Sequence, residues 1–392
     1  MAGVTKHIYE HDLRDIRSMW TKELKEIKNI LPKYYNDSDI IELLKKFYPH
    51  EWNSVEFKYS YYTIKDKKLL NRRKKLRYQM LPPEKLLRTL PLFKKLLNEN
   101  YRKKYSEDFE QEEVIEKSKD LLKNRAPKIK KIDEKIEKAI LRTQKMTPNF
   151  LDKLIGLYER KRTSQKDKKY ILQELKKYYN KKIINFFLKL NDTEINSQLR
   201  WEAFYHLQSF NINPRARKQK YILVHTKNRK RKKYLKDIYS KETYNIPFTP
   251  NELEYRIKNG KEQQLKEFDF FISHSYKDGK AVQKLITYQN ELNKNIFCDW
   301  INDADYLKRK LLGKETLEVI RLRLEQSKNL IFVESEDSKN SIWCKYELNY
   351  YLSLDKPIYY ITKEDIERDN FVIKPLENKW FIDNEYKAKI KF

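Results

Sequence analysis

The segments that decide the fold are DFFISHSYKD, residues 269–278, and VESEDSKNSIWCKYELNYY, residues 333–351. The first is a short apolar run that ends in small polar residues, which predicts a buried strand followed by a strand-to-helix loop. Open α/β sheets bind their ligands at such loops. The second predicts another strand end, a polar turn and a helix that carries Trp343 and Glu347 on one face, because they stand four residues apart. We therefore expect an aromatic ring and a carboxylate to share one pocket wall.

Short apolar strands alternate with helices from Phe268 onward. The predicted strands are 268–273, 295–300, 329–334 and 357–361, and the predicted helices are 280–292, 314–326 and 342–354. This βαβα order requires a parallel sheet, because right-handed crossovers place helices on both of its faces. We expect a doubly wound, flavodoxin-like sheet of about five strands, the last of them from residues 379–383.

Charge is distributed very unevenly along the 392 residues, whose formal net charge is +29. Residues 266–392 contain 22 basic residues (Lys and Arg) and 22 acidic residues (Asp and Glu), whereas residues 1–265 contain 64 basic and 35 acidic residues. The whole excess therefore lies in the front part, which suggests an acidic partner such as nucleic acid, an anionic surface or an acidic protein. The alternative is a composition effect, since Lys, Ile, Asn and Tyr are abundant and Gly and Ala are scarce, as AT-rich coding would produce.

The length predicts two or three domains. The two cysteines, Cys298 and Cys344, exclude a disulfide framework and fit a reducing compartment. The N-terminus lacks an apolar core of signal-peptide length, and no apolar run is long enough to span a membrane. We expect a cytoplasmic protein without membrane contact.

Residues 1–260 are predicted to be a basic, mostly helical region with a break near 145 or 210. Residues 11–31 carry apolar side chains at spacings of three and four, which is typical of an amphipathic helix. The Tyr-rich stretch 55–64 predicts a strand pair, and 112–144 predicts a helical hairpin or a short coiled coil. The charged residues 261–267 are expected to be a linker.

Residues 215–236 are dense in cations, with a predicted strand at 221–225. A run of five cations follows: Arg229, Lys230, Arg231, Lys232 and Lys233. Interleaved Lys, Arg and Tyr can bind phosphates while the rings stack on bases. A solvated basic face or a docking surface explains the run equally well, because no nucleic-acid-binding signature accompanies it.

Three motifs carry a family resemblance: FFISHSYKD, the strand FCDW with a long polar loop after it, and ES-x-x-S-x-x-S-x-W-C-x-x-E-L from Glu334 to Leu348. In this order they resemble a Toll/interleukin-1 receptor (TIR) domain of the bacterial kind, which we place at residues 266–392. The resemblance leaves 1–260 unassigned. In this family the helix after the third strand carries a glutamate needed to cleave NAD, and the matching position is Glu347; Trp343 falls where many NAD-cleaving members have a tryptophan.

The chemistry of that reaction makes sense for these residues. Breaking the nicotinamide–ribose bond develops positive charge on the sugar, and one carboxylate such as Glu347 can stabilise it. Nicotinamide leaves already activated by its cationic ring, so no general acid is needed. The predicted substrate-binding residues are Trp343, Ser273, His274, Ser275, Asp299 and Asp303. We expect NAD⁺ as substrate, no separate cofactor and no metal.

Plainer interpretations stay open for several of these residues. Glu347 can be a solvent-facing helix residue, Trp343 can be core packing and His274 can be a simple loop residue. The loop that contains Asp303 acts in this family as an assembly and gating surface, but here it is long and lacks the usual glycine near its start. Which of its residues touch NAD is therefore not fixed.

The resemblance implies an NAD⁺ nucleosidase, or glycohydrolase, that gives nicotinamide and ADP-ribose or a cyclic variant. It further implies an effector of antiviral defence, switched on when copies assemble through the TIR and N-terminal regions into a homo-oligomer. One alternative is a non-enzymatic TIR scaffold for protein–protein docking. Another is a nucleic-acid-sensing protein whose TIR domain is the output.

Overall fold

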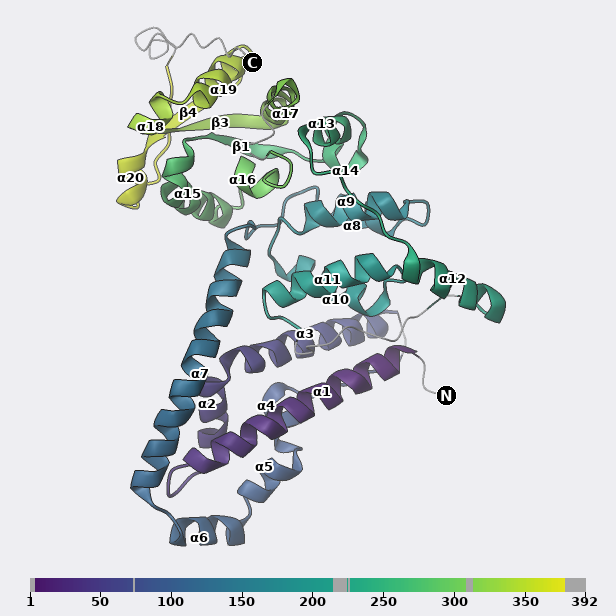
Figure 1. Cartoon of the computed structure of the whole chain (residues 1–392), viewed down its shortest axis with the longest axis vertical. Helices are drawn as coiled ribbons and strands as arrows, with labels where there is room; N and C mark the ends of the chain where they lie inside the picture. The colour runs from purple at the N-terminus through teal and green to yellow at the C-terminus, as the bar shows by residue number, and fades with distance from the viewer. Residues whose placement is uncertain (1–3, 73–74, 214–223, 225, 308–312, 378–392) are drawn as a thin grey trace. The chain divides into compact units, whose positions relative to one another are not determined.

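The computed structural model describes residues 4–72, 75–213, 224, 226–307 and 313–377 (Figure 1). They form two compact units, one of Met1–Ala139 with Ile184–Glu242 and the other of Ile140–Ile183 with Thr243–Phe392. This division differs from the predicted boundary near residue 260, because two helices from the middle of the chain pack with the C-terminal sheet. The predicted strands at 221–225 and 379–383 lie outside the described residues, apart from Val224.

The N-terminal unit is helical, as predicted. Its helices are α1 (Val4–Ile27), α2 (Asp37–Phe47), α3 (Pro49–Asn71), α4 (Pro83–Arg88), α5 (Pro91–Leu96), α6 (Glu99–Glu107), α7 (Gln111–Ile140), α11 (Ser197–Ser209) and α12 (Arg229–Lys241), and α10 (Lys181–Thr193) crosses the boundary between the units. Three of them begin at a proline, whose missing N–H costs nothing in the first turn of a helix. The Asn36 side chain caps α2 by accepting from the N–H groups of Ser38 and Asp39.

Two predictions for this unit were wrong. The predicted strand pair at 55–64 lies inside α3, where Trp52, Val55 and Tyr62 are buried at helical spacing. Burial of one helical face outweighs the strand preference of the tyrosines. The predicted hairpin or coiled coil at 112–144 is a single helix, α7, with Pro127 inside it. Its apolar side chains stay partly exposed and none is buried, so the hairpin is excluded, whereas a coiled coil with a second copy of the chain stays a prediction.

The C-terminal unit contains a five-stranded sheet and its covering helices. The strands are β1 (Phe268–Ser273), β2 (Ile296–Phe297), β3 (Ser327–Glu334), β4 (Ile358–Thr362) and β5 (Lys374–Pro375), and the helices are α8 (Leu151–Glu159), α9 (Gln165–Leu175), α13 (Pro250–Asn259), α14 (Lys261–Gln264), α15 (Gly279–Glu291), α16 (Asp299–Asn302), α17 (Lys314–Glu325), α18 (Glu336–Lys339), α19 (Ile342–Leu352) and α20 (Lys363–Glu367). The flavodoxin-like α/β fold predicted for this part is confirmed.

The strand order is β2-β1-β3-β4-β5. Strands β1 to β4 pair in parallel, while β5 pairs antiparallel with β4, Tyr359 facing Pro375. Strand side chains alternate between the two faces: Phe270 and Ile272 pack with α15, whereas Phe271 packs with α17 and α19. Figure 1 shows these helices on opposite sides of the sheet. The chain leaves β1 in one direction for β2 and returns on its other side for β3, so a topological switch point lies between β1 and β3.

A buried ion cluster ties α9 to the sheet domain within the C-terminal unit. Glu174 accepts from Lys177 at 2.9 and 3.0 Å and from Lys266 at 2.8 Å. Gln263 donates to Glu174 at 2.8 Å and accepts from Arg323 at 2.9 Å. The predicted linker 261–267 is therefore mostly helix α14 and its buried continuation, because its polar side chains have partners in this cluster.

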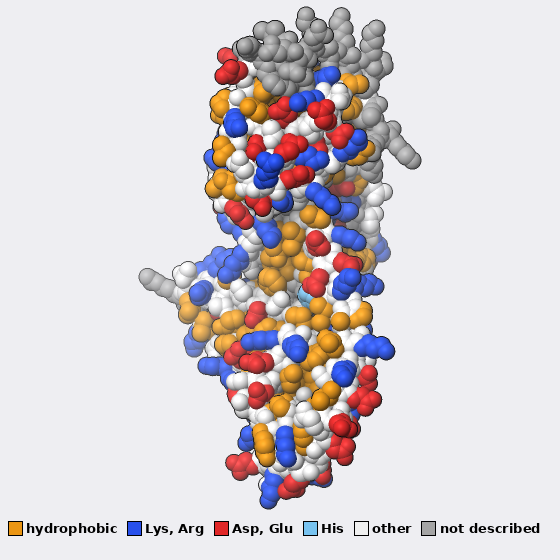
Figure 2. Space-filling model, turned by 90° about the vertical axis from the view of Figure 1, so that its left-hand side faces the viewer, with side chains coloured by type: hydrophobic (Ala, Val, Ile, Leu, Met, Phe, Trp, Pro, Cys, Tyr) orange, Lys and Arg blue, Asp and Glu red, His pale blue; other side chains and the backbone are white. Residues whose placement is uncertain are grey.

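Surface charge agrees with the even balance of residues 266–392. On the face that Figure 2 shows, acidic and basic side chains are interspersed over the upper part, which belongs to the C-terminal unit. Among the described residues, no helix is both long and apolar enough to cross a membrane.

Candidate functional site

The site is built around Glu347 on α19. The Ser341 side chain caps this helix by accepting from the Cys344 N–H, and the helix then presents Glu347 to the carboxyl end of β1. There the Ser273 hydroxyl, which is fully buried, donates to Glu347 Oε2 at 2.6 Å. Ser273 is the last residue of β1, so Glu347 lies at the switch point of the sheet, where ligands of open α/β sheets bind.

Glu347 lies in an environment that disfavours its charge. Burial raises the pKa of this carboxyl to about 8, the hydrogen bond from Ser273 opposes the shift, and repulsion from Asp299 adds to it. No Lys, Arg or His among the residues that the structure describes forms an ion pair with it. A partly buried carboxylate without a cation is costly unless its charge has a use.

His274 and Asp299 meet beside this carboxylate. They follow the carboxyl ends of β1 and β2, and His274 Nε2 lies 3.9 Å from Asp299 Oδ1. His274 Nδ1 lies 3.2 Å from the carbonyl oxygen of Ile272. The imidazole is nearly enclosed, with 7% of its side chain exposed, whereas the Asp299 side chain is 60% exposed. The structure thus brings three of the predicted residues, Ser273, His274 and Asp299, to one edge of the sheet.

Ser275 and Trp343 have structural partners of their own. Ser275 is buried and caps the turn after β1, where its hydroxyl accepts from the Lys277 N–H at 3.4 Å. Trp343 is half-buried and packs against the core between the sheet and helices α17 and α19. Core packing accounts for Trp343 as it stands, and its contact with substrate stays a prediction.

Asp303 does not join the site. Its carboxylate accepts from Arg323 Nε at 2.7 Å and Nη2 at 3.0 Å, and both side chains are completely buried. Burial alone would raise the pKa of Asp303, but the neighbouring Arg323, Lys177 and Lys266 hold this pKa below its usual range. Asp303 therefore belongs to the buried ion cluster, and the prediction that it binds substrate is at odds with this pairing.

Sequence reasoning missed Trp300, whose ring packs edge-on against His274 with centroids 5.5 Å apart. The ring also lies against the first residue of α15. A Cβ at Gly279 would lie 2.6 Å from it, so only glycine leaves room for this approach. The signal was present in the FCDW motif, where Trp300 directly follows Asp299.

A second link that sequence reasoning missed joins the loops after β1 and β3. Ser335 donates to Asp278 at 2.6 Å, and Lys363 lies 3.2 Å from the same carboxylate. These contacts fix the polar turns on either side of the switch point, so they position the site without belonging to it.

The five predicted nucleic-acid contacts lie in the N-terminal unit. Arg229, Lys230, Arg231, Lys232 and Lys233 form the start of α12, which buries none of its residues. None of the five forms an ion pair with another described residue. Four of the five are exposed and Lys232 is half-buried, and cations near the start of a helix meet the positive end of its dipole.

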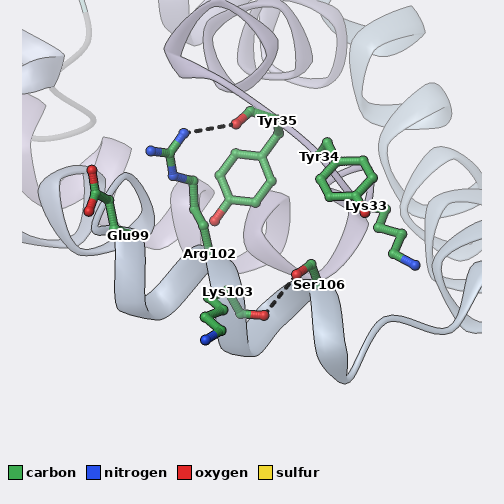
Figure 3. Close-up of a pocket in the computed structure, with 7 residues that line it drawn as sticks. All are labelled: Lys33, Tyr34, Tyr35, Glu99, Arg102, Lys103 and Ser106. Carbon is green, nitrogen blue, oxygen red and sulfur yellow. Dashed lines mark hydrogen bonds between the residues drawn. The ribbon is translucent and has the colours of Figure 1, made fainter.

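A pocket lies elsewhere in the N-terminal unit, between the segment before α2 and helix α6 (Figure 3). It is lined by Lys33, Tyr34, Tyr35, Glu99, Arg102, Lys103 and Ser106. Arg102 reaches the Tyr35 carbonyl at 3.5 Å, and the Tyr34 ring is 78% exposed. With three cations and one carboxylate, its chemistry suits an anion rather than a reaction.

Comparisons with known proteins agree with the sheet domain and its motifs. Residues 271–368 match the family described as Thoeris protein ThsB, TIR-like domain. The chain is 36% identical over 101 residues, 26% of its length and 51% of the relative's, to a probable 3' cyclic ADP-D-ribose synthase ThsB' of Bacillus cereus (strain MSX-D12). It is 32% identical over 83 residues, 21% of its length and 10% of the relative's, to Toll-like receptor 2 of Mus musculus. No solved structure matches the chain.

One relative covers both units. The chain is 35% identical over 365 residues, 93% of its own length and 93% of the relative's, to a putative cyclic ADP-D-ribose synthase TIR2 of Cytobacillus dafuensis. The likeness therefore extends through the helical N-terminal part as well as the sheet domain. On this evidence the chain belongs to the family of bacterial TIR-domain proteins that this relative represents.

Proposed function

We propose that this protein cleaves the bond between nicotinamide and ribose in NAD⁺. The observation that carries the proposal is the position of Glu347 at the switch point of the sheet, where no described Lys, Arg or His forms an ion pair with it and the Ser273 hydroxyl donates to it at 2.6 Å. The names of two relatives, both cyclic ADP-D-ribose synthases, support the same substrate.

The charges of the reaction explain why a lone carboxylate suffices. As the bond between ribose C1′ and the pyridinium nitrogen breaks, its electron pair stays with nicotinamide, whose ring becomes neutral. The positive charge passes to the sugar, where ionised Glu347 stabilises the oxocarbenium-like transition state. Water then attacks C1′ and releases a proton to give ADP-ribose, or a nucleophile within the same molecule attacks to give a cyclic product.

We favour the cyclic product, because both relatives are named for it. A site that makes it must exclude water from C1′ until the internal nucleophile arrives. The half-buried Trp343 and the enclosed His274 are the side chains of the predicted set that suit this role.

The test is release of nicotinamide from NAD⁺ by the purified full chain, with the other product identified by chromatography and mass. Glu347→Gln removes the charge at nearly constant size and should slow release by about 10²- to 10³-fold. Glu336→Gln is the matched control, because Glu336 is an exposed carboxylate on the neighbouring helix α18. Equal release by wild type and Glu347→Gln would overturn the proposal and favour a TIR scaffold for docking.

The proposal extends to regulation and biological role on the strength of the family resemblance. Copies of the chain assemble, and assembly completes the site, so cleavage per molecule should rise with protein concentration and with the fraction of oligomer. A monomeric variant that cleaves NAD⁺ as fast as the assembled form would contradict this. The cellular role is antiviral defence: phage plaque numbers should fall in cells that express wild type but not Glu347→Gln.

A second candidate function is nucleic-acid binding through α12. Four of the five cations from Arg229 to Lys233 are exposed, Lys232 is half-buried, and none forms an ion pair with a described residue. Phosphate contacts make affinity fall steeply with salt, with a log–log slope near the number of contacts. Changing Lys230, Lys232 and Lys233 to Gln should lower that slope by about 2 to 3, whereas the same change at Lys117, Lys119 and Lys123 of α7 should leave it unchanged.

A further inference from the structure

Three side chains of unlike chemistry come together beside Glu347. Their donor atoms are His274 Nε2, Cys298 Sγ and an Asp299 carboxylate oxygen, and all lie within 4.8 Å of one another. Cys298 Sγ lies 3.9 Å from Asp299 Oδ1, as does His274 Nε2. We predicted no metal from the sequence. His274 is far in the chain from the other two residues, and the pairing of β1 with β2 brings the three together.

The three donors suit a borderline-soft divalent ion. Thiolate, imidazole and carboxylate are the ligands that zinc takes, whereas a thiolate is a poor ligand for Mg²⁺ or Ca²⁺. Ligand atoms of a tetrahedral zinc ion lie about 3.3 to 3.8 Å apart, given its bond lengths. The two separations that involve Asp299 are 3.9 Å each and exceed this range only slightly. All three donor atoms lie within 4.8 Å of one another, and the Asp299 side chain is exposed, with its Oδ1 also accepting from the Trp300 N–H at 2.8 Å.

The surroundings prepare the imidazole to bind. The Ile272 carbonyl can only accept, so the contact of 3.2 Å places the proton on Nδ1 and leaves the Nε2 lone pair toward Asp299. A ligating histidine typically donates its other N–H in this way. Trp300 packs on the imidazole and is itself fixed by its close approach to Gly279. The ring is therefore already oriented before any ion arrives.

We propose that His274, Cys298 and Asp299 form a binding site for Zn²⁺ with one open coordination position, and that Zn²⁺ bound there inhibits the enzyme. The inhibitory part rests on the proposed NAD⁺ cleavage, whereas the binding part does not. Bound Zn²⁺ occupies the edge of the sheet where His274 and Asp299 are expected to meet NAD⁺. It also places a double positive charge near Glu347, which the field of Asp299 already reaches, and so weakens the attraction of that carboxylate for the developing sugar cation.

Binding is tested with Co²⁺ alone, added to the metal-free full chain. A thiolate ligand gives a near-ultraviolet charge-transfer band, and tetrahedral Co²⁺ gives intense visible bands. We expect both at one Co²⁺ per chain, and their loss when Zn²⁺ is added. The chain has only two cysteines, so Cys298→Ser should abolish the charge-transfer band and Cys344→Ser should keep it. No band, or a band that survives Cys298→Ser, overturns the proposal.

A second variant covers the case in which Cys298→Ser does not fold, since Cys298 is fully buried. Asp299→Asn changes an exposed side chain and should weaken Co²⁺ binding by about 10- to 100-fold while the charge-transfer band persists. Unchanged affinity would overturn the assignment of Asp299 and with it the three-ligand site.

Inhibition is tested by nicotinamide release with Zn²⁺ buffered at defined free concentrations. Cys298→Ser should raise the Zn²⁺ concentration for half-inhibition by about 100-fold. If wild type releases no nicotinamide without metal, the proposed function fails while the Co²⁺ result stands. If wild type is active and fully insensitive to Zn²⁺ that is shown to bind, the inhibitory part fails alone.

Discussion

Two carboxylates of the C-terminal unit have opposite surroundings. Glu174 on α9 is bonded by Lys177 and Lys266, with Arg323 nearby, and although its burial acts to raise the pKa, these cations hold it well below the usual value. Glu347 on α19 has a serine hydroxyl where Glu174 has cations, and burial raises its pKa to about 8. The same side chain is thus made strongly acidic in one place and weakly acidic in the other.

The difference separates structural from chemical use of a buried charge. Around Glu174 the charged side chains are paired with opposite charges within the protein. The cluster therefore holds α9 on the sheet domain and leaves no unpaired charge for a ligand. Around Glu347 no described residue supplies an opposite charge, and a cationic substrate can supply it. Perturbed carboxylates in such positions cluster at functional sites.

The largest expected effect is on stability, from Glu174→Gln. The change leaves Lys177, Lys266 and Arg323 buried with Asp303 as the one remaining anion of the cluster, and breaking a buried ion pair costs about 3 to 5 kcal/mol. Urea unfolding of the full chain, followed by fluorescence, measures the loss. Glu336→Gln, at an exposed site, should change the free energy of unfolding by less than about 0.5 kcal/mol. If Glu174→Gln lowered the free energy of unfolding by no more than Glu336→Gln does, the cluster would not stabilise the unit.

Glu347→Gln should show the reverse pattern, with activity lost and stability kept. Removing one preorganised group that stabilises transition-state charge costs about 10²- to 10³-fold in rate. The folded-state pKa of about 8 lies above the ordinary value of 4.5. The carboxyl therefore contributes stability that is full below pH 4.5 and is lost as pH rises through 8.

The stability of Glu347→Gln relative to wild type should accordingly increase between pH 5 and pH 8.5. Urea titrations at the two pH values measure this difference. A variant that loses stability equally at both would show that Glu347 serves the packing of α19 and that the contrast with Glu174 is false.

The sheet domain could be predicted well because its signals are local. Apolar runs with alternating helices fix the strand order, and the family motifs place Glu347 and Ser273 together although 74 residues separate them. The second strand was predicted too long, because Asp299 already begins helix α16.

The rest depends on tertiary contacts that leave no local pattern. The pairing of Asp303 with Arg323 turns a residue predicted to bind substrate into part of the core. Glu174 and Lys266 lie 92 residues apart, so nothing in the sequence shows that α9 packs with the sheet domain. In α3, burial at helical spacing overrides the strand preference of tyrosine, and no single-sequence rule weighs one against the other.

The pH profile tests the Glu347 half of the comparison directly. Glu347 must be ionised to act, so kcat/KM should rise about tenfold per pH unit up to pH 8 and level off above it. Bound NAD⁺ brings a positive ring near the carboxylate, which lowers its pKa, so the midpoint for kcat should lie below that for kcat/KM. Initial rates of nicotinamide release between pH 5.5 and 9.5 provide both curves. A flat profile across pH 8 would mean that the carboxylate is already ionised in the free enzyme.

The smallest expected effect comes from Ser273→Ala. The hydroxyl of Ser273 opposes the rise in the pKa of Glu347, so its removal should move the midpoint of kcat/KM to higher pH and lower the rate at pH 7.5 by about tenfold. Ser335→Ala removes a hydrogen bond of the same length, 2.6 Å, to Asp278, which keeps Lys363 as partner, and should leave the midpoint in place. A lower rate with an unmoved midpoint would make Ser273 a residue that only orients the carboxylate. An unchanged rate and midpoint would mean that the hydrogen bond from Ser273 to Glu347 is absent when NAD⁺ reacts. The charge of Glu347 would then be stabilised by the substrate, whereas Glu174 keeps Lys177 and Lys266 as partners within the protein.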